Sequence, residues 1–234
     1  MALSDELLAE VQRIFREQWS IRDARVVPEP QGLGLESNNA AHLDRATVLY
    51  ADLSDSTKLV DAKAWSFAAE VYQAFLYCAG RIIRNAGGTI VAYDGDRVMA
   101  IFYDDHQSTN AAKCGLQINY AVKNIISPAL LKQCPTPPYA IKHVVGIDTS
   151  ELHAVRTGVR GGNDIVWVGR AANYAAKLTT LDHDFPTRIT DGVFQKISDS
   201  SKYGGNPKRV MWEPRLWTAQ DNMRIHRSTW WWGL

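Results

Sequence analysis

An apolar run that ends in an acid constrains this chain more than any other feature. Residues 48–50 read as a short buried strand, Asp52 follows it, and residues 53–57 are mostly small and polar before helix-compatible sequence resumes. A carboxylate at the end of a buried strand needs a cation, a hydrogen bond or a proton. The stretch therefore indicates either a turn or helix cap, where Asp is common, or a ligand for a cation.

A second acid, Asp96, lies in a tight hairpin signal. Asp-Gly-Asp at 94–96 separates two short apolar stretches, residues 89–93 and 97–102. If this hairpin pairs beside the first strand, Asp52 and Asp96 emerge at one end of the sheet and repel each other. Such a pair of carboxylates suits Mg²⁺ or Mn²⁺. Asp-Gly-Asp is also a common turn without function, so both interpretations stay open at this point.

The order of the apolar stretches predicts an α+β fold in which helices cover a mostly antiparallel sheet. We expect strands at residues 47–51, 89–93, 97–102, 139–147, 165–168 and 187–190, and helices at residues 4–19, 58–86, 106–126 and 170–181. The predicted parts of the chain are an N-terminal helix and linker (1–45), a main domain (46–213) and a C-terminal tail (214–234). The tail holds three consecutive Trp residues, 230–232, and we expect it to pack on the domain or on a partner.

The charge balance bears on partners. Lys and Arg number 26 and Asp and Glu number 25, which argues against a nucleic-acid or membrane-surface binder. Apolar runs are too short for a spanning helix, which needs about 18 residues or more, and the first residues lack a signal-peptide pattern. Three cysteines without a CxxC pair indicate reduced thiols. We therefore expect a cytoplasmic protein.

Three separated blocks resemble the catalytic domain of the class III nucleotidyl cyclases, the adenylate/guanylate cyclase family. They are VLYADLSDST at 48–57, YDGDRVMAIF at 93–102 and VGRAANYAAKL at 168–178. They occur in the family's order, and the likeness covers residues 46–213. The resemblance implies a ferredoxin-like α+β fold. It also implies a head-to-tail homodimer with active sites at the shared interface and a nucleoside triphosphate as substrate.

The resemblance also implies roles for four residues. Asp52 and Asp96 would hold two divalent ions, Mg²⁺ or Mn²⁺, one activating the ribose 3′-hydroxyl and the other binding the triphosphate. Asn173 of the other protomer would orient the ribose. Lys177 stands where the family usually has Arg, which neutralises charge on the α-phosphoryl group, and Lys supplies that charge without a planar fork. Lys177 thus departs from the family pattern, and a solvated helix charge is the alternative.

Further groups are expected to serve the phosphates. The backbone N–H groups after Asp52, at the start of a helix, offer a place for a polyphosphate; the residues concerned are Leu53, Ser54, Asp55, Ser56 and Thr57. Arg97 and Arg170 are near in sequence to the proposed catalytic residues and could add charge. Candidates for contacts to the outer phosphates are Lys202, Lys208 and Arg209.

The positions that read a purine base in the family are apolar here. One lies four residues before the second metal acid and the other seven residues before the catalytic Asn. They hold Ala92 and Val166, whose side chains cannot hydrogen-bond. Tyr50, two residues before Asp52, should point to the same sheet face. Its phenol could contact a base or fill space beside a small one, or it could be ordinary core.

The missing purine readers decide the expected substrate. The chain resembles the pyrimidine cyclases of bacterial anti-phage signalling, which make cyclic UMP or cyclic CMP to switch on a separate effector protein. We therefore expect a pyrimidine nucleotide cyclase, with UTP favoured over CTP. Two alternatives remain: an adenylate or guanylate cyclase with unusual base readers, and a catalytically degenerate domain that only binds a nucleotide.

Overall fold

The computed structural model describes residues 2–34, 38–136, 138–159 and 162–234. Its helices are α1 (Leu3–Arg16), η1 (Pro30–Gly32), α2 (Ser56–Ala62), α3 (Trp65–Asn85), α4 (Gln107–Ala121), η2 (Val122–Ile126), α5 (Ser127–Gln133), α6 (Arg170–Thr179), α7 (Asp191–Lys196), α8 (Asp199–Lys202) and η3 (Thr218–Gln220). Its strands are β1 (Ser20–Asp23), β2 (Asn39–Leu53), β3 (Thr89–Asp94), β4 (Arg97–Phe102), β5 (His143–Val159), β6 (Gly162–Val168), β7 (Thr187–Thr190), β8 (Tyr203–Gly204), β9 (Arg209–Val210), β10 (Glu213–Trp217) and β11 (Met223–Ser228). None of the described helices combines the length and apolarity needed to cross a bilayer.

One sheet organises the molecule. Its strands run in the order β10-β11-β7-β5-β2-β4-β3, with β1 added beside β2 and β6 beside β5. The neighbours pair antiparallel except for β1 with β2 and β5 with β7. The predicted α+β class with a mostly antiparallel sheet is therefore confirmed. Strand β2 is central and is paired along its length.

The alternation of side chains along β2 separates two packing layers. Leu49, Ala51 and Leu53 point into the large core formed with α3 and α4. Val48 and Tyr50 point to the opposite face, where they pack with alanines of α6. Because successive strand residues face opposite sides, Asp52 lies on the α6 face together with Tyr50.

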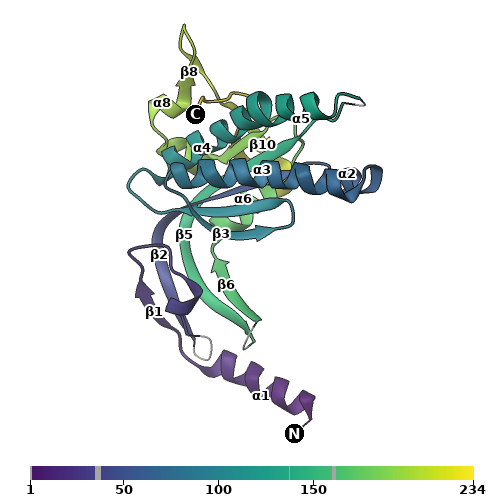
Figure 1. The fold of residues 1–234 in the computed structure, drawn as a ribbon. Coiled ribbons are helices and arrows are strands. Elements are labelled where there is room, and N and C mark those ends of the chain that lie inside the picture. Colours follow the sequence, from purple (N-terminus) through teal and green to yellow (C-terminus); the bar gives the residue numbers. More distant parts are fainter. Residues whose placement is uncertain (1, 35–37, 137, 160–161) are drawn as a thin grey trace.

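Part of the sheet extends beyond the body of the molecule. Figure 1 shows β1, part of β2, part of β5 and β6 reaching away from the helices, with α1 at the far end. The pairing of β2 with β5 shifts register between Leu43 and Ala46, so the predicted domain boundary at residue 46 falls inside a continuous strand. Helix α1 buries none of its residues. Of the predicted linker, residues 35–37 lie outside the described residues.

Two predicted helices are interrupted. The stretch expected as one helix over 58–86 is α2 followed by α3, because the chain becomes extended at Lys63 and Ala64. The helix expected over 106–126 is α4 and continues through the π-helical turn η2 into α5. The hairpin β3–β4 and the strand β7 lie where the sequence predicted them.

The C-terminal residues belong to the main fold. Strand β11 pairs with β7, so the predicted tail boundary at 213/214 falls inside β10 of the same sheet. Trp230 and Trp232 pack on the large core, and the N–H of Trp232 donates to the carbonyl of Leu116 at 3.1 Å. Trp231 instead remains 48% exposed. The tail thus packs on its own domain.

This difference between neighbouring tryptophans predicts a difference in stability. Trp232→Ala removes a side chain that packs on the core, so we expect the free energy of unfolding to fall by about 2 kcal/mol. Trp231→Ala serves as the matched control and should change it by less than about 1 kcal/mol. Urea denaturation with unchanged slopes measures both values. Equal losses in the two variants would show that the tail does not pack as described.

Candidate active site

Asp52 lies near the end of the central strand. It is opposite Arg97 of β4 on one side and Val144 of β5 on the other. Thr179 Oγ1, at the end of α6, lies 3.4 Å from Asp52 Oδ2, while its hydroxyl donates to the carbonyl of Ala176 at 2.8 Å. Because both edges of β2 are paired here, the backbone holds this carboxylate in a fixed place on the α6 face.

Asp96 lies in the two-residue turn between β3 and β4. Gly95 has a φ of 61°, a left-handed conformation that glycine adopts without steric cost, and the turn closes with Asp94 opposite Arg97. Since Arg97 also pairs with Asp52, the register brings Asp96 beside Asp52. The pKa of Asp52 is raised to about 6, mainly by burial and next by the negative charge of Asp96.

The two carboxylates fit a divalent cation. Asp96 Oδ2 is buried and has no hydrogen-bond partner among the described residues, which is costly unless a cation or proton compensates it. Repulsion between the carboxylates of Asp52 and Asp96 would likewise be relieved by a bound cation. The described residues include no cluster of three or more His, Cys, Asp or Glu side chains that could hold a metal. The remaining coordination positions would therefore fall to phosphate oxygens and water.

The segment after Asp52 is a turn built around Asp55. Asp55 has a φ of 61°, and its carboxylate lies 2.7 Å from Lys58 Nζ and 3.8 Å from Lys142 Nζ. The N–H of Ser54 already donates to the carbonyl of Lys142 at 2.9 Å. Leu53 is buried in the core. Within the predicted phosphate segment, the structure thus leaves the first N–H groups of α2, at Ser56 and Thr57, without an intrahelical acceptor.

Asn173 and Lys177 lie one turn apart on the exposed side of α6. The buried side of this helix consists largely of alanines, and these residues let it lie close to the sheet. Lys177 Nζ donates to Gln220 Oε1 at 3.4 Å and lies 5.8 Å from the ring centroid of Tyr174. Both predicted catalytic side chains are therefore accessible from outside the chain.

A cavity of about 270 Å³ lies between the β3–β4 hairpin, β6 and α6. Its walls include Tyr50, Ala92, Met99, Asp164, Trp167 and Asn173. Tyr50, Ala92 and Asn173 are thus brought together within a single chain. Val166, the other predicted base-pocket residue, does not line this cavity and is 44% exposed. Its strand neighbours Ile165 and Trp167 face the cavity instead, as alternation along a strand requires.

Sequence reasoning missed Asp164 and Trp167. Counting seven residues back from Asn173 selects Val166, whereas Asp164 lies nine residues back and Trp167 six. A usable signal was present, because an aromatic residue in a short strand directly before the Asn helix suits a pocket wall. Strand alternation would have placed Trp167 and Val166 on opposite faces.

The two predicted additional cations are already engaged. Arg97 Nη2 donates to Asp94 Oδ2 at 2.6 Å, and its guanidinium lies 5.9 Å from the ring centroid of Tyr50. Arg170 Nη2 donates to Asp148 Oδ1 at 3.2 Å and to the carbonyl of Thr149. Arg170 therefore ties the start of α6 to β5. Burial raises the pKa of Asp148 although Thr190 and Arg170 act in the opposite direction.

The basic residues near β8 and β9 pack against aromatic rings. Lys202 Nζ lies 5.3 Å from the ring centroid of Phe194, and Arg209 Cζ lies 5.8 Å from that of Trp230. The cavity beside Asn173 is lined by none of the three predicted phosphate contacts, Lys202, Lys208 and Arg209.

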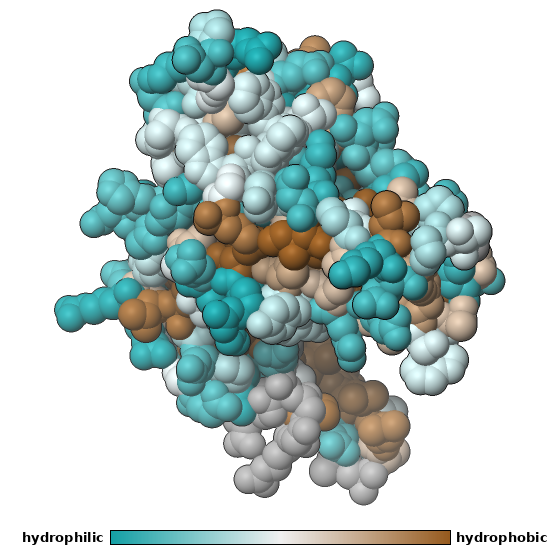
Figure 2. Space-filling view, turned by 45° about the horizontal axis from the view of Figure 1, so that its top comes forward, coloured by the Kyte–Doolittle hydropathy of each residue, from teal (hydrophilic) through white to brown (hydrophobic). Residues whose placement is uncertain are grey.

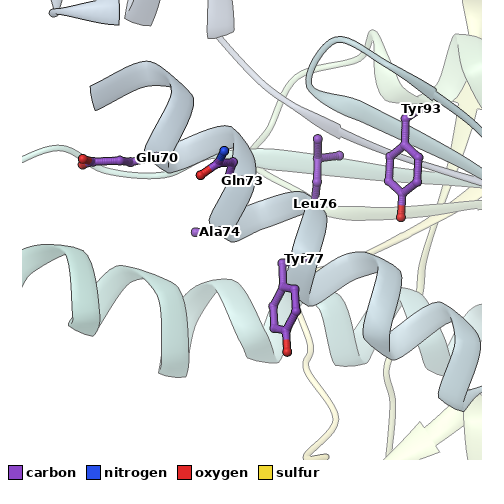
Figure 3. A pocket seen from close by; sticks show the side chains of 6 residues that line it. All are labelled: Glu70, Gln73, Ala74, Leu76, Tyr77 and Tyr93. Atoms are coloured by element: carbon purple, nitrogen blue, oxygen red, sulfur yellow. The ribbon is translucent and has the colours of Figure 1, made fainter. Parts of the chain in front are cut away.

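Other hollows lie away from the two acids. A groove of about 680 Å³ along α3 is lined by Glu70, Gln73 and Tyr77 of that helix and by Tyr93 (Figure 3). A second, mostly apolar groove of about 340 Å³ lies between α3 and α5. Figure 2 shows a band of apolar side chains crossing one face between hydrophilic ones. None of the predicted site residues lines either groove, so size alone does not identify the site.

Known proteins resemble this chain over its whole length. It is 50% identical over 234 residues to a uridylate cyclase of Burkholderia cepacia, covering 99% of both chains. It is 44% identical to a uridylate cyclase of Xanthomonas perforans, covering 100% of both. The crystal structure of the adenylyl cyclase CyaB from P. aeruginosa superposes with a TM-score of 0.64 at 17% identity, over 81% of this chain and 95% of that one. No family model matches the chain.

Proposed function

The chain belongs to the uridylate cyclases, within the class III nucleotidyl cyclases, and from that premise we propose that it converts UTP to cyclic UMP and pyrophosphate. The observation that carries the choice of a pyrimidine is the cavity beside Asn173. Ala92 offers no hydrogen bond where the purine cyclases place a base reader. Tyr50 and Trp167 narrow the same space, which suits a single ring better than a fused pair.

Asp52 and Asp96 are the proposed metal ligands. Divalent ions held there would polarise the ribose 3′-hydroxyl and neutralise the triphosphate. The chain's own contribution is to hold two carboxylates at one end of the sheet, where Asp96 Oδ2 lacks a partner. Thr179 Oγ1 lies beside Asp52 Oδ2, at 3.4 Å. The identity of the metal, Mg²⁺ or Mn²⁺, is part of the proposal.

Asn173 and Lys177 are the proposed catalytic residues that contact the ribose and the α-phosphoryl group. Asn173 lines the base cavity and can donate its side-chain amide to the ribose. Lys177, one turn further along α6, supplies a positive charge for the α-phosphoryl group as the new bond forms. Its contact with Gln220 is long, at 3.4 Å, so little binding energy opposes its release toward a phosphate.

A head-to-tail homodimer would combine these two groups across chains. Each chain carries one pair of acids and, on α6, Asn173 at the cavity wall and Lys177 one turn further along, and the side chains of Asn173 and Lys177 are exposed. In this proposal, the acids of one protomer meet Asn173 and Lys177 of the other. Helix α1 exposes its apolar residues, including Phe15 at 86%, which supports contact with a second copy. We further propose that the enzyme acts in the cytoplasm and signals phage infection to a separate effector through its product.

The proposal predicts one dominant product. The purified protein, given each of the four nucleoside triphosphates with Mn²⁺ or Mg²⁺, should form cyclic UMP from UTP at a rate at least about tenfold above any other cyclic nucleotide. Chromatography against authentic standards identifies the product. Cyclic AMP or cyclic GMP as the main product would refute the choice of base. Absence of all cyclic products would favour a domain that binds nucleotide without turnover.

A further inference from the structure

Helix α1 presents an apolar stripe that the rest of the described chain leaves uncovered. The large apolar side chains of the helix recur at helical spacing and are all exposed: Leu3, Leu7, Leu8, Val11, Ile14 and Phe15. With about 3.6 residues per turn, Val11 lies near the middle of this stripe. A helix of 14 residues is only marginally stable in water without packing. The stripe therefore calls for a partner.

The end of α1 is anchored to the extended strands. Asn38, a buried residue just before β2, donates its side-chain amide to the carbonyl of Ile14 at 2.8 Å and to that of Glu17 at 2.9 Å. The N–H of Ser20 donates in turn to the carbonyl of Asn38 at 2.8 Å. Figure 1 shows α1 at the far end of these strands, away from the other helices. The sheet thus holds the helix outward, where another molecule can reach its stripe.

The polar side of α1 does not suit a lipid surface. It carries acids at three helical positions and arginines at two: Asp5, Glu6, Glu10, Arg13 and Arg16. Helices that lie on anionic lipid are instead rich in Lys and Arg on this side. A protein partner therefore fits the helix better than a membrane does.

The charges along α1 are complementary to those of the same helix running the other way. Asp5 lies in the first turn and Arg16 in the last, about three turns apart, so both border the apolar stripe on the same side. When two copies pack antiparallel about a twofold axis, the same side of each helix meets. Each Asp5 then faces Arg16 of the second copy, and such opposite charges fix the orientation of a contact.

We propose that α1 pairs antiparallel with α1 of a second copy of the chain, with Val11 next to the twofold axis. Leu7 and Leu8 of one copy then pack against Ile14 and Phe15 of the other, since these positions are symmetric about Val11. The contact between two 14-residue helices is smaller than a standard interface of roughly 800 Å² per partner. It therefore supplements a larger contact between the copies, and in this respect it rests on the dimer of the proposed function.

Disulfide formation in the full-length chain tests the pairing. Val11→Cys places two thiols next to the twofold axis, whereas Leu3→Cys places them about 24 Å apart along the helices. Both positions are exposed on a helix that buries none of its residues, so both variants should fold. With oxidised glutathione, Val11→Cys should form covalent dimer at least about tenfold faster than Leu3→Cys. The unaltered chain, which has cysteines of its own, is the background control: Cys78, Cys114 and Cys134.

Charge reversal tests the direction of the pairing. In the Val11→Cys chain, Asp5→Arg sets like charges against Arg16 of the second copy, and Arg16→Glu sets them against Asp5. Each of these chains alone should crosslink at least about threefold more slowly. An equal mixture should recover the rate through the mixed disulfide, because the reversed charges again face opposite ones. Arg25→Glu, at an exposed arginine outside the helix, is the control and should leave the rate unchanged.

The outcomes distinguish this inference from the proposed function. Equal crosslinking of Val11→Cys and Leu3→Cys, or none above the unaltered chain, overturns the antiparallel pairing. Charge reversal without effect, or a mixture that does not recover, overturns it as well. The expected crosslinks in a chain that makes no cyclic UMP refute the function and support the pairing. Formation of cyclic UMP without these crosslinks supports the function and refutes the pairing.

Discussion

The Asp52→Asn enzyme is expected to form cyclic nucleotide at least about a thousandfold more slowly than the unaltered chain. The amide keeps the shape of the side chain but removes the negative charge that would hold a divalent ion. Asp96→Asn should have a comparable effect, because its buried Oδ2 has no partner within the described chain. Initial rates of cyclic UMP formation at saturating Mn²⁺ and UTP measure the loss.

The same substitution should stabilise the metal-free protein. The pKa of Asp52 is about 6 in the fold against a reference value of 3.8, so the folded state binds more protons between these values and stability falls as pH rises through this window. Removing the charge should raise the free energy of unfolding above pH 6 by about 1 kcal/mol, less than the full shift implies because Asp52 is partly exposed and water screens it.

Urea denaturation in EDTA at pH 4 and pH 7 checks this expectation. The unaltered protein should lose stability between these pH values relative to Asp52→Asn. Asp61→Asn, an exposed acid on α2, serves as the control and should change neither rate nor pH dependence. Full activity in either Asp52→Asn or Asp96→Asn would exclude the metal role. Loss of activity together with loss of the fold would instead indicate a structural role.

Mixed dimers should recover activity that neither parent shows. Asp52→Asn removes the acid half of a site and Asn173→Ala removes the ribose half, so each homodimer has two defective sites. In a head-to-tail heterodimer one site is doubly defective and the other is intact. Random exchange makes half of the dimers mixed, so the mixture should reach about a quarter of the unaltered rate, about 250-fold or more above the Asp52→Asn parent.

The arrangement of the two substitutions provides the control. A chain that carries both Asp52→Asn and Asn173→Ala, mixed with the unaltered chain, puts one defect into each site of the mixed dimer, so the mixed dimers should be inactive. An equal mixture should therefore keep about a quarter of the unaltered rate, from the unaltered homodimers, whereas about half would remain if both groups acted within one chain. No recovery in the first mixture, with exchange verified by tagged copies, would mean that both groups act within one chain.

The elements that depend on local signals could be predicted from the sequence. The hairpin β3–β4 follows from Asp94, Gly95 and Asp96 between apolar stretches, since only a few residues accept the left-handed conformation of such a turn. The strand β7 and helix α6 follow from periodicity. The long first part of β2 could not be predicted, because residues 39–46 are held extended by pairing with β1 and β5 and carry few strand-forming side chains.

In the candidate site, too, some residues could be predicted from the sequence and others could not. Asp52, Asp96 and Asn173 stand out by chemistry and by resemblance, and the register places the two acids together. The partners of the arginines could not be predicted, since Arg170 meets a buried Asp148 that comes from another element. Nor could the wall formed by Asp164 and Trp167, because spacing along the chain does not say which side chains of a strand face a cavity.

The paired edges of β2 have a consequence for how such an enzyme could be controlled. The backbone of Asp52 is paired with a strand on each side, so this carboxylate sits on the central sheet and not on a lid or a loop. If catalysis needs groups from two copies of the chain, the activity would be controlled by how often two copies form a dimer. The concentration of the protein, and any contact that joins or separates the extended strands of two copies, would then set the rate of product formation.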